Sequence, residues 1–253
     1  MINIGITTYN RVNFLKRCVK SVVENTIVPY NLFIYDDNST DRTGRYLLDE
    51  LREQENITVF TSNKRRGIVP GFNKLWDLSV QKAGHNKYFC YLQDDVVITE
   101  KGWLKKLIGC YEAKEQHPTT FGLFTGHHAP EHPTEDVEFI NGEEVLVKKS
   151  MRATNMIAPY TFWDKIGRIP AKNPDGSVRG FPGPRNADGS RGRGSSIDVY
   201  ITGHQSKGVY VHGHAGPTNS WALGTYCMVI PGLVRHEALS KEDSTWGNPN
   251  KEV

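Results

Sequence analysis

The sequence predicts an α/β fold with a mostly parallel central sheet. Short apolar runs, typical of buried strands, alternate with stretches in which apolar residues recur at helical spacing. Three such strand–helix pairs follow one another before a fourth strand, which favours right-handed crossovers and helices on both faces of the sheet. A chain of 253 residues is long enough to form one such domain around a substantial core.

The first half of the chain carries the clearest pattern. Its four strands are expected at residues 2–7, 31–35, 57–60 and 88–92. Its three helices are expected around the apolar residues of 14–23, 46–51 and 72–78.

The second half is less regular. Strands are expected at residues 121–124, 144–147, 209–211 and 226–230, and a helix is expected to begin at Tyr160. Residues 169–196 are rich in Gly, Pro, Asn and Arg, which predicts a long mobile loop.

Composition and charge exclude several classes of protein. A hydrophobic fraction of 38% and a charged fraction of 23% exclude a wholly disordered chain and a membrane bundle. The net charge of +3 is too small to favour binding to a nucleic acid duplex. The sequence contains no run of roughly 18 apolar residues and no signal-peptide pattern, so we expect a cytoplasmic protein with no membrane span.

The four cysteines lie far apart and show no C-x-x-C spacing. They are Cys18, Cys90, Cys110 and Cys227. We expect them to be reduced thiols in the core.

Polar side chains follow each strand of the first half. In chain order they are Tyr9 and Arg11, Asp36 and Asp37, Arg65 and Arg66, and Asp94 and Asp95. Because ligands bind beyond the carboxyl ends of parallel strands, these side chains are expected to gather around one crevice.

Asp94 and Asp95 come directly after a buried apolar strand. Burying unpaired carboxylates is costly, and a hard divalent cation is their natural partner. Mg²⁺ or Mn²⁺ takes one or two carboxylates and leaves positions for substrate phosphates, which suits a nucleoside diphosphate. The alternative is that the two residues are helix N-caps before Thr99.

The run from Asp36 to Asp41 is open to two interpretations. It can be a strand-to-helix junction in which Ser39 or Asp41 caps the helix. A cap does not explain both leading aspartates, and a carboxylate at a strand end can accept hydrogen bonds from a base or a ribose.

Three motifs, in their order and spacing, resemble those of glycosyltransferase family 2 domains of the GT-A type. They are Ile6-Thr7-Thr8-Tyr9-Asn10-Arg11, then Tyr35-Asp36-Asp37-Asn38-Ser39-Thr40-Asp41, and then Leu92-Gln93-Asp94-Asp95. The resemblance covers residues 1–110, and only weakly extends to 196–200 and 231–236. It implies a Rossmann-like GT-A sandwich over a single domain, residues 1–253, with a nucleotide-binding half (1–110) and an acceptor-side half (111–253).

The resemblance also implies an activity, which is the metal-dependent and inverting transfer of a sugar from a nucleotide-sugar to a hydroxyl group. A UDP-sugar is the favoured donor and Mn²⁺ or Mg²⁺ the cofactor, whereas the acceptor can be a glycan, a lipid, a protein or a modified nucleic acid. The alternatives are a sugar-phosphate nucleotidyltransferase, which shares the sheet and the metal carboxylates, and a non-catalytic nucleotide-sugar binding module. The sequence does not indicate an oligomeric state.

The family pattern implies that Thr7 and Tyr9 line the nucleotide pocket, with Tyr9 stacked on the base. Asp37 is expected to hydrogen-bond that base, and Arg11 to contribute to the nucleotide site. Asp95 is expected to hold the metal.

Two positions of the pattern differ from the rest, one because it departs from the family motif and one because it allows two roles. The first acid of the Asp-x-Asp motif of the family is Gln93 here, so metal binding is expected to depend on Asp94 and mainly on Asp95. Arg66 follows the third strand and either contacts the diphosphate or the base, or belongs to a solvated turn.

Asp198 resembles the general base of the family, which takes the proton of the acceptor hydroxyl. It can instead be an N-cap, and Glu143, Glu144 and Asp188 are the other candidate bases.

Histidines are the remaining candidates for the metal site. His236, in the segment Pro231-Gly232-Leu233-Val234-Arg235-His236, resembles a family histidine near the metal and the diphosphate, and a structural role is equally open. His212 and His214 are ambiguous, and His127 and His128 either border the acceptor or belong to a solvated loop.

The predicted mobile loop contains Arg179, Arg185, Arg191 and Arg193. Such a segment can fold over a bound diphosphate and exclude water.

Overall fold

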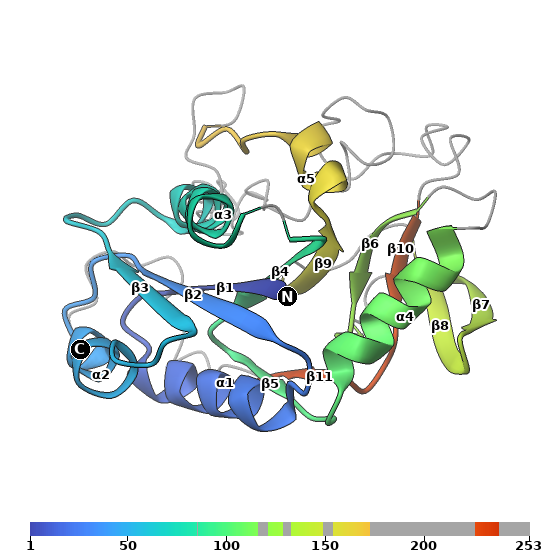
Figure 1. Cartoon of the computed structure of the whole chain (residues 1–253), viewed down its shortest axis with the longest axis horizontal. Helices are drawn as coiled ribbons and strands as arrows, with labels where there is room; N and C mark the ends of the chain where they lie inside the picture. Colours follow the sequence, from blue (N-terminus) through green and yellow to red (C-terminus); the bar gives the residue numbers. More distant parts are fainter. Residues whose placement is uncertain (85, 116–120, 129–132, 149–153, 173–225, 238–253) are drawn as a thin grey trace, which may run out of the picture.

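The computed structural model describes residues 1–84, 86–115, 121–128, 133–148, 154–172 and 226–237 (Figure 1). Nine of the described strands form one sheet in the order β3-β2-β1-β4-β9-β6-β10-β8-β7. They are β1 (Ile2–Thr8), β2 (Tyr30–Asp36), β3 (Ile57–Thr61), β4 (Tyr88–Gln93), β6 (Phe121–Thr125), β7 (Thr134–Ile140), β8 (Glu143–Lys148), β9 (Asn155–Pro159) and β10 (Tyr226–Val229).

The sheet is mostly parallel in direction. The pairs β3–β2, β2–β1, β1–β4 and β6–β10 are parallel, and every described pair that contains β8 or β9 is antiparallel. Strands β8 and β9 therefore run against the others. This arrangement confirms the predicted α/β fold with a mostly parallel central sheet.

Helices cover both faces of the sheet. They are α1 (Val12–Asn25), α2 (Thr43–Tyr46) with the π-helical turn Leu47–Leu51, α3 (Ile68–Ala83), α4 (Trp103–Glu115) and α5 (Tyr160–Ile166). In Figure 1, α3 and α5 lie on one side of the strands and α1 and α2 on the other. A separate two-stranded sheet pairs β5 (Val96–Ile98) with β11 (Val234–His236).

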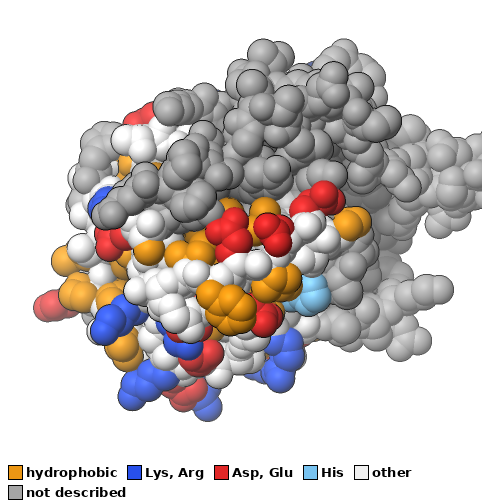
Figure 2. Space-filling view, turned by 90° about the vertical axis from the view of Figure 1, so that its right-hand side faces the viewer, with side chains coloured by type: hydrophobic (Ala, Val, Ile, Leu, Met, Phe, Trp, Pro, Cys, Tyr) orange, Lys and Arg blue, Asp and Glu red, His pale blue; other side chains and the backbone are white. Residues whose placement is uncertain are grey.

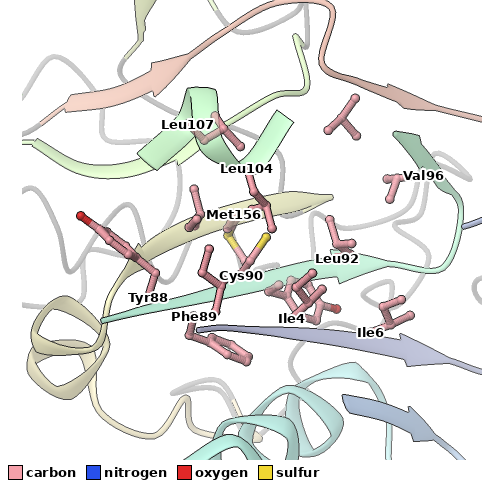
Figure 3. Packing of buried hydrophobic residues seen from close by; sticks show 14 of the residues in the cluster. Ile4, Ile6, Tyr88, Phe89, Cys90, Leu92, Val96, Leu104, Leu107 and Met156 are labelled. Carbon is pink, nitrogen blue, oxygen red and sulfur yellow. The ribbon is translucent and has the colours of Figure 1, made fainter. Parts of the chain in front are cut away.

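The core explains the sequence pattern. Strands β1 and β4 are buried along almost their whole length, as expected for parallel strands covered on both faces. Helix α1 buries Leu15, Cys18, Val19 and Val22, one stripe at helical spacing. Figure 3 shows Leu104 and Leu107 of α4 pointing toward the region of the sheet where Cys90 of β4 and Met156 of β9 lie.

The structure confirms most of the predicted elements. The confirmed strands are those at 2–7, 31–35, 57–60, 88–92, 121–124, 144–147 and 226–230. The confirmed helices are those around 14–23, 46–51 and 72–78 and the one from Tyr160. The strand predicted at 209–211 lies outside the described residues, as does the predicted loop beyond residue 172. The structure adds β5, β7, β9, β11 and α4, for which no element was predicted. The four cysteines are buried and free of disulfides, as expected.

Strand β7 is an edge strand of the nine-stranded sheet, at the end of the molecule shown in Figure 2. Its Val137 and Phe139 are 47% and 79% exposed. Glu135, Asp136 and Glu138 interleave with them along the strand. Charges at an edge oppose pairing with the edge of another sheet, so the sequence of β7 protects it against aggregation.

No helix among the described residues is long and apolar enough to span a membrane.

Gly71 of α3 packs against the strands that carry the candidate site. A Cβ atom at this position would lie 2.8 Å from Cδ1 of Tyr35 and 3.1 Å from Cγ2 of Thr7. We expect Gly71→Ala to lower the free energy of unfolding by about 1–3 kcal/mol through overpacking, which corresponds to a melting temperature lower by roughly 2–10 °C. Thermal unfolding followed by circular dichroism measures this shift.

Gly44→Ala is the matched control, because a Cβ at Gly44 of α2 meets no atom within 4 Å. Alanine also has the higher helix propensity, so the melting temperature of this variant should be unchanged or higher. Equal melting temperatures for the two variants would show that α3 does not pack against β1 and β2 as closely as described.

Candidate functional site

The two acidic residues of the third motif lie on a turn. Asp94 and Asp95 connect β4 to β5, and the next helix, α4, begins only at Trp103. The alternative that they cap a helix is therefore wrong. Both side chains are buried, at 3% and 2% exposure, so their charges need partners inside the protein.

Arg11 is the principal partner of these carboxylates. Its Nη1 lies 2.8 Å from Oδ2 of Asp95 and 3.2 Å from Oδ1 of Asp94, and its side chain is buried between them. The hydroxyl of Thr8 donates to the other oxygen of Asp94 at 2.6 Å. One guanidinium thus compensates part of the charge of two carboxylates, and both oxygens of Asp94 are engaged.

The two aspartates differ in acidity because their surroundings differ. Burial raises the pKa of Asp94 to about 6, against the opposing effect of Arg11 and with a further contribution from the charge of Asp95. Burial also acts to raise the pKa of Asp95, but the hydrogen bond from His236 and the charge of Arg11 outweigh it, so that this pKa lies below its usual value. Asp95 is therefore the more acidic carboxyl group of the pair.

The residues around Asp95 fit a divalent cation. Nε2 of His236 lies 3.4 Å from Oδ2 of Asp95, a separation that suits two ligands of one ion. Oδ1 of Asp95 is buried and has no hydrogen-bond partner among the described residues, and a cation would satisfy it. No three described His, Cys, Asp or Glu side chains form a ready metal cage, so further ligands would come from the phosphates of a substrate or from water.

The short second sheet brings His236 to this place. The antiparallel pairing of β11 with β5 puts His236 opposite Val96, the residue after Asp95. The backbone N–H of Glu237 then donates to the carbonyl of Asp95 at 2.8 Å. The imidazole of His127, at the end of β6, lies with its centroid 5.7 Å from that of His236.

Asp37 shapes the loop between β3 and α3. Its two carboxylate oxygens accept the backbone N–H groups of Arg66 and Gly67, each at 2.7 Å. Burial raises the pKa of Asp37, and these two N–H groups oppose the shift. Gly67 adopts φ +92°, a conformation that favours glycine and lets both N–H groups point at one carboxylate.

Asp36 has a structural role. Its Oδ1 accepts hydrogen bonds from the backbone N–H and the hydroxyl of Ser39, which closes the turn after β2. Asn10 then links this turn to the loop after β1, because its Oδ1 accepts the N–H of Thr40 at 2.7 Å. The two loops are thus held together.

Thr8 connects the two acidic motifs. Its carbonyl accepts the N–H of Asp37 at 3.0 Å, and its hydroxyl donates to Asp94. Asp37 and the Asp94–Asp95 turn therefore lie at the same edge of the sheet and are both bonded to one residue. This is the arrangement expected for the carboxyl ends of neighbouring parallel strands.

The other residues that were predicted to bind the nucleotide lie near this edge. The hydroxyl of Thr7 is 2.7 Å from that of Tyr91 in the sheet interior. The guanidinium of Arg65 lies over the ring of Tyr9, 4.1 Å from its centroid. Arg66 is exposed, and one of its guanidinium nitrogens contacts Asn63 at 3.2 Å.

The predicted base Asp198 lies outside the described residues, and so do Asp188, His212, His214 and the four arginines of the predicted loop. Glu143 pairs with Lys106 at 2.9 Å, an ion pair on the surface near α4. Glu144, on β8, is exposed.

A hollow of about 680 Å³ lies away from these motifs in the described part of the chain. Ile2 and Tyr88, which begin β1 and β4, contribute to its lining, together with Lys101 and Lys105 near the start of α4. It therefore opens at the end of the sheet opposite the acidic motifs. The acidic motifs, which are joined by hydrogen bonds at the carboxyl ends of the strands, indicate the position of the functional site better than this hollow does.

The sequence assigned no individual role to Thr8 or Arg65 and did not indicate Glu237, and the structure places all three in or beside the site. Thr8 belongs to the first motif and Arg65 was expected at the crevice, so their positions in the sequence were the available signal. Glu237 carried no signal, because its place depends on the pairing of β11 with a strand more than 130 residues earlier.

Comparisons with known proteins agree with the motifs. Residues 3–122 match the model of the family described as Glycosyl transferase family 2. A segment of 73 residues is 34% identical to a chondroitin synthase of Escherichia coli and represents 29% of this chain and 10% of that protein.

Two solved structures resemble part of the chain. TarS of S. aureus in complex with UDP-GlcNAc has 16% identity and a TM-score of 0.43, over 61% of this chain and 44% of that chain. The mannosyltransferase PcManGT of Pyrobaculum calidifontis in complex with GDP-Man and Mn²⁺ has 13% identity and a TM-score of 0.49, over 67% and 47%. The chain thus spans a tenth of the curated relative and less than half of either solved chain.

The segment that matches the family model contains Thr8, Asp37 and Asp95, the residues on which the geometry of the site depends. The part of the chain that holds the candidate site is thus the part that is similar to glycosyl transferase family 2.

Proposed function

We propose that the chain is a metal-dependent, inverting glycosyltransferase that moves a sugar from a nucleotide-sugar, with a UDP-sugar as the favoured donor, to a hydroxyl group. The observation that carries this proposal is the bridge made by Thr8, which joins Asp37 to the Asp94–Asp95 turn at one edge of the sheet. A nucleotide that spans the two motifs would have its base at the first and its diphosphate at the second.

In this proposal the loops after β1, β2 and β3 bind the base of the donor. Oδ1 of Asp37 accepts the N–H of Arg66 and the hydroxyl of Tyr35, whereas Oδ2 has the N–H of Gly67 as its described donor and keeps a second lone pair for an N–H of the base. Tyr9 offers a ring for stacking, with Arg65 over one face. Arg66 is exposed on the same loop and is placed to contact a phosphate or the base.

The Asp94–Asp95 turn binds the diphosphate of the donor in this proposal. Asp95 and His236 would hold Mn²⁺ or Mg²⁺, which stabilises the negative charge of the departing nucleoside diphosphate. Arg11 keeps Asp94 and Asp95 in place by its two ion pairs and limits the repulsion between them.

The acceptor side belongs to the second half of the same domain. In our proposal residues 1–110 bind the donor, and residues 111–253 bind the acceptor, which is a glycan, a lipid, a protein or a modified nucleic acid. Asp198 takes the proton of the acceptor hydroxyl as that oxygen attacks the anomeric carbon.

Product analysis tests the proposal. Incubation with UDP-sugars and with GDP-, CMP- and TDP-sugars, with Mn²⁺ or with EDTA, is followed by chromatography of the nucleotides. We expect metal-dependent release of the nucleoside diphosphate, by slow hydrolysis of the donor when no acceptor is present. Release of pyrophosphate from UTP in a parallel incubation with a sugar 1-phosphate would identify a nucleotidyltransferase instead, and metal-dependent binding without turnover of any donor would identify a binding module.

A further inference from the structure

His236 depends on few described contacts for its position. It ends β11, a strand of three residues that pairs with β5. Beyond it, the backbone N–H of Glu237 donates to the carbonyl of Asp95. A strand this short has little stability of its own, so the side chains that fasten its end decide how closely the imidazole approaches Asp95.

Glu237 is fastened to helix α1. Its Oε2 accepts two hydrogen bonds from the guanidinium of Arg17, one from Nε at 2.8 Å and one from Nη2. The side chain of Glu237 is 18% exposed and that of Arg17 is 48% exposed. The ion pair is therefore partly sheltered.

The same face of α1 also holds the acidic turn. The guanidinium groups of Arg17 and Arg11 lie 4.7 Å and 5.8 Å from the centroid of Phe14. Positions three apart are neighbours on a helix, so Arg11, Phe14 and Arg17 form one row. At one end of the row Arg11 binds Asp94 and Asp95, and at the other Arg17 binds Glu237.

We propose that Arg17 and Glu237 are positioning residues, which hold His236 against Asp95 from helix α1 and thereby set the affinity of the site for a divalent cation. The proposal rests on the proposed function in one respect, that a cation binds between Asp95 and His236. Neither Arg17 nor Glu237 needs to touch the cation or the donor.

Binding of Mn²⁺ to the whole chain, measured from the electron paramagnetic resonance signal of free Mn²⁺, tests this role without an assay of activity. We expect Arg17→Ala to weaken Mn²⁺ binding about two- to fivefold, in line with the strength of a partly exposed ion pair. The affinity for UDP in the absence of metal should not change. A loss of general stability would lower both affinities, so the difference between them separates positioning from folding.

Lys16→Ala is the matched control. It removes an ion pair of the same helix, between Lys16 and Glu50 at 2.7 Å, which has no link to β11. Mn²⁺ binding by this variant should equal that of the wild type. Charge exchange gives the second test: Arg17→Glu and Glu237→Arg should each weaken Mn²⁺ binding, and the double variant should regain most of it.

Two kinds of result would overturn the proposal, and they differ in meaning. Wild-type affinity for Mn²⁺ in Arg17→Ala, or no recovery in the double variant, would refute the positioning role and leave the proposed function intact. If the wild type does not bind Mn²⁺, or if His236→Ala binds it normally, the cation site itself is wrong and the positioning role fails with it.

Discussion

Asp95→Asn is expected to reduce metal-dependent turnover of the donor by about 10²- to 10⁴-fold, because charge stabilisation by a bound metal ion contributes several kcal/mol. The substitution keeps the shape of the side chain and removes its charge. Oδ2 of Asp95 faces Arg11 and His236, and its Oδ1 is buried without a described partner, so the amide loses the attraction that holds a cation. Donor hydrolysis at saturating Mn²⁺, together with Mn²⁺ binding, measures the loss.

Asp94→Asn separates the two acids of the turn. Both oxygens of Asp94 are already used by Thr8 and Arg11, so its substitution should change stability more than Mn²⁺ binding. Asp136→Asn, at an exposed position of β7, is the control for the loss of a charge and should leave both quantities unchanged. Full turnover in Asp95→Asn would remove the metal from the proposed mechanism.

The first half of the fold and its acidic motifs could be predicted because their signals are local. Strand β4 is a continuous apolar run, and Asp94 and Asp95 directly follow it. One stretch of sequence therefore predicts both the buried strand and the position of the acids at its end. The same holds for β2 and Asp37. In such strands the hydrophobic pattern and the fold agree at every residue.

The contacts that make these residues a site could not be predicted, since they depend on pairings between distant segments. The sequence does not show that Arg11 would turn inward to two carboxylates instead of outward to a phosphate. It does not show that β11 pairs with β5 and carries His236 to Asp95. Strands of three residues are too short for their periodicity to be recognised.

Asp37→Ala is expected to weaken nucleotide binding at least about a hundredfold and to lower stability as well. The substitution removes a hydrogen-bond acceptor for the base, and it leaves the N–H groups of Arg66 and Gly67 without their described acceptor. Each polar group left unsatisfied in a buried place costs about 1–3 kcal/mol. Calorimetric titration with UDP and thermal unfolding measure the two effects.

The double role of Asp37 predicts that the two effects are coupled through the loop. Arg65 and Arg66 lie in the loop between β3 and α3. If this loop loses the hydrogen bond from Gly67 to Asp37, the guanidinium of Arg65 also moves away from the ring of Tyr9. Asp41→Ala is the control: Asp41 is exposed on the neighbouring loop and accepts the N–H of Thr43 at 2.9 Å and that of Val12 at 3.4 Å, so its loss should lower stability and leave nucleotide affinity unchanged. If Asp37→Ala unfolds at a lower temperature yet binds UDP like the wild type, Asp37 serves only the loop, and the base has to be recognised elsewhere.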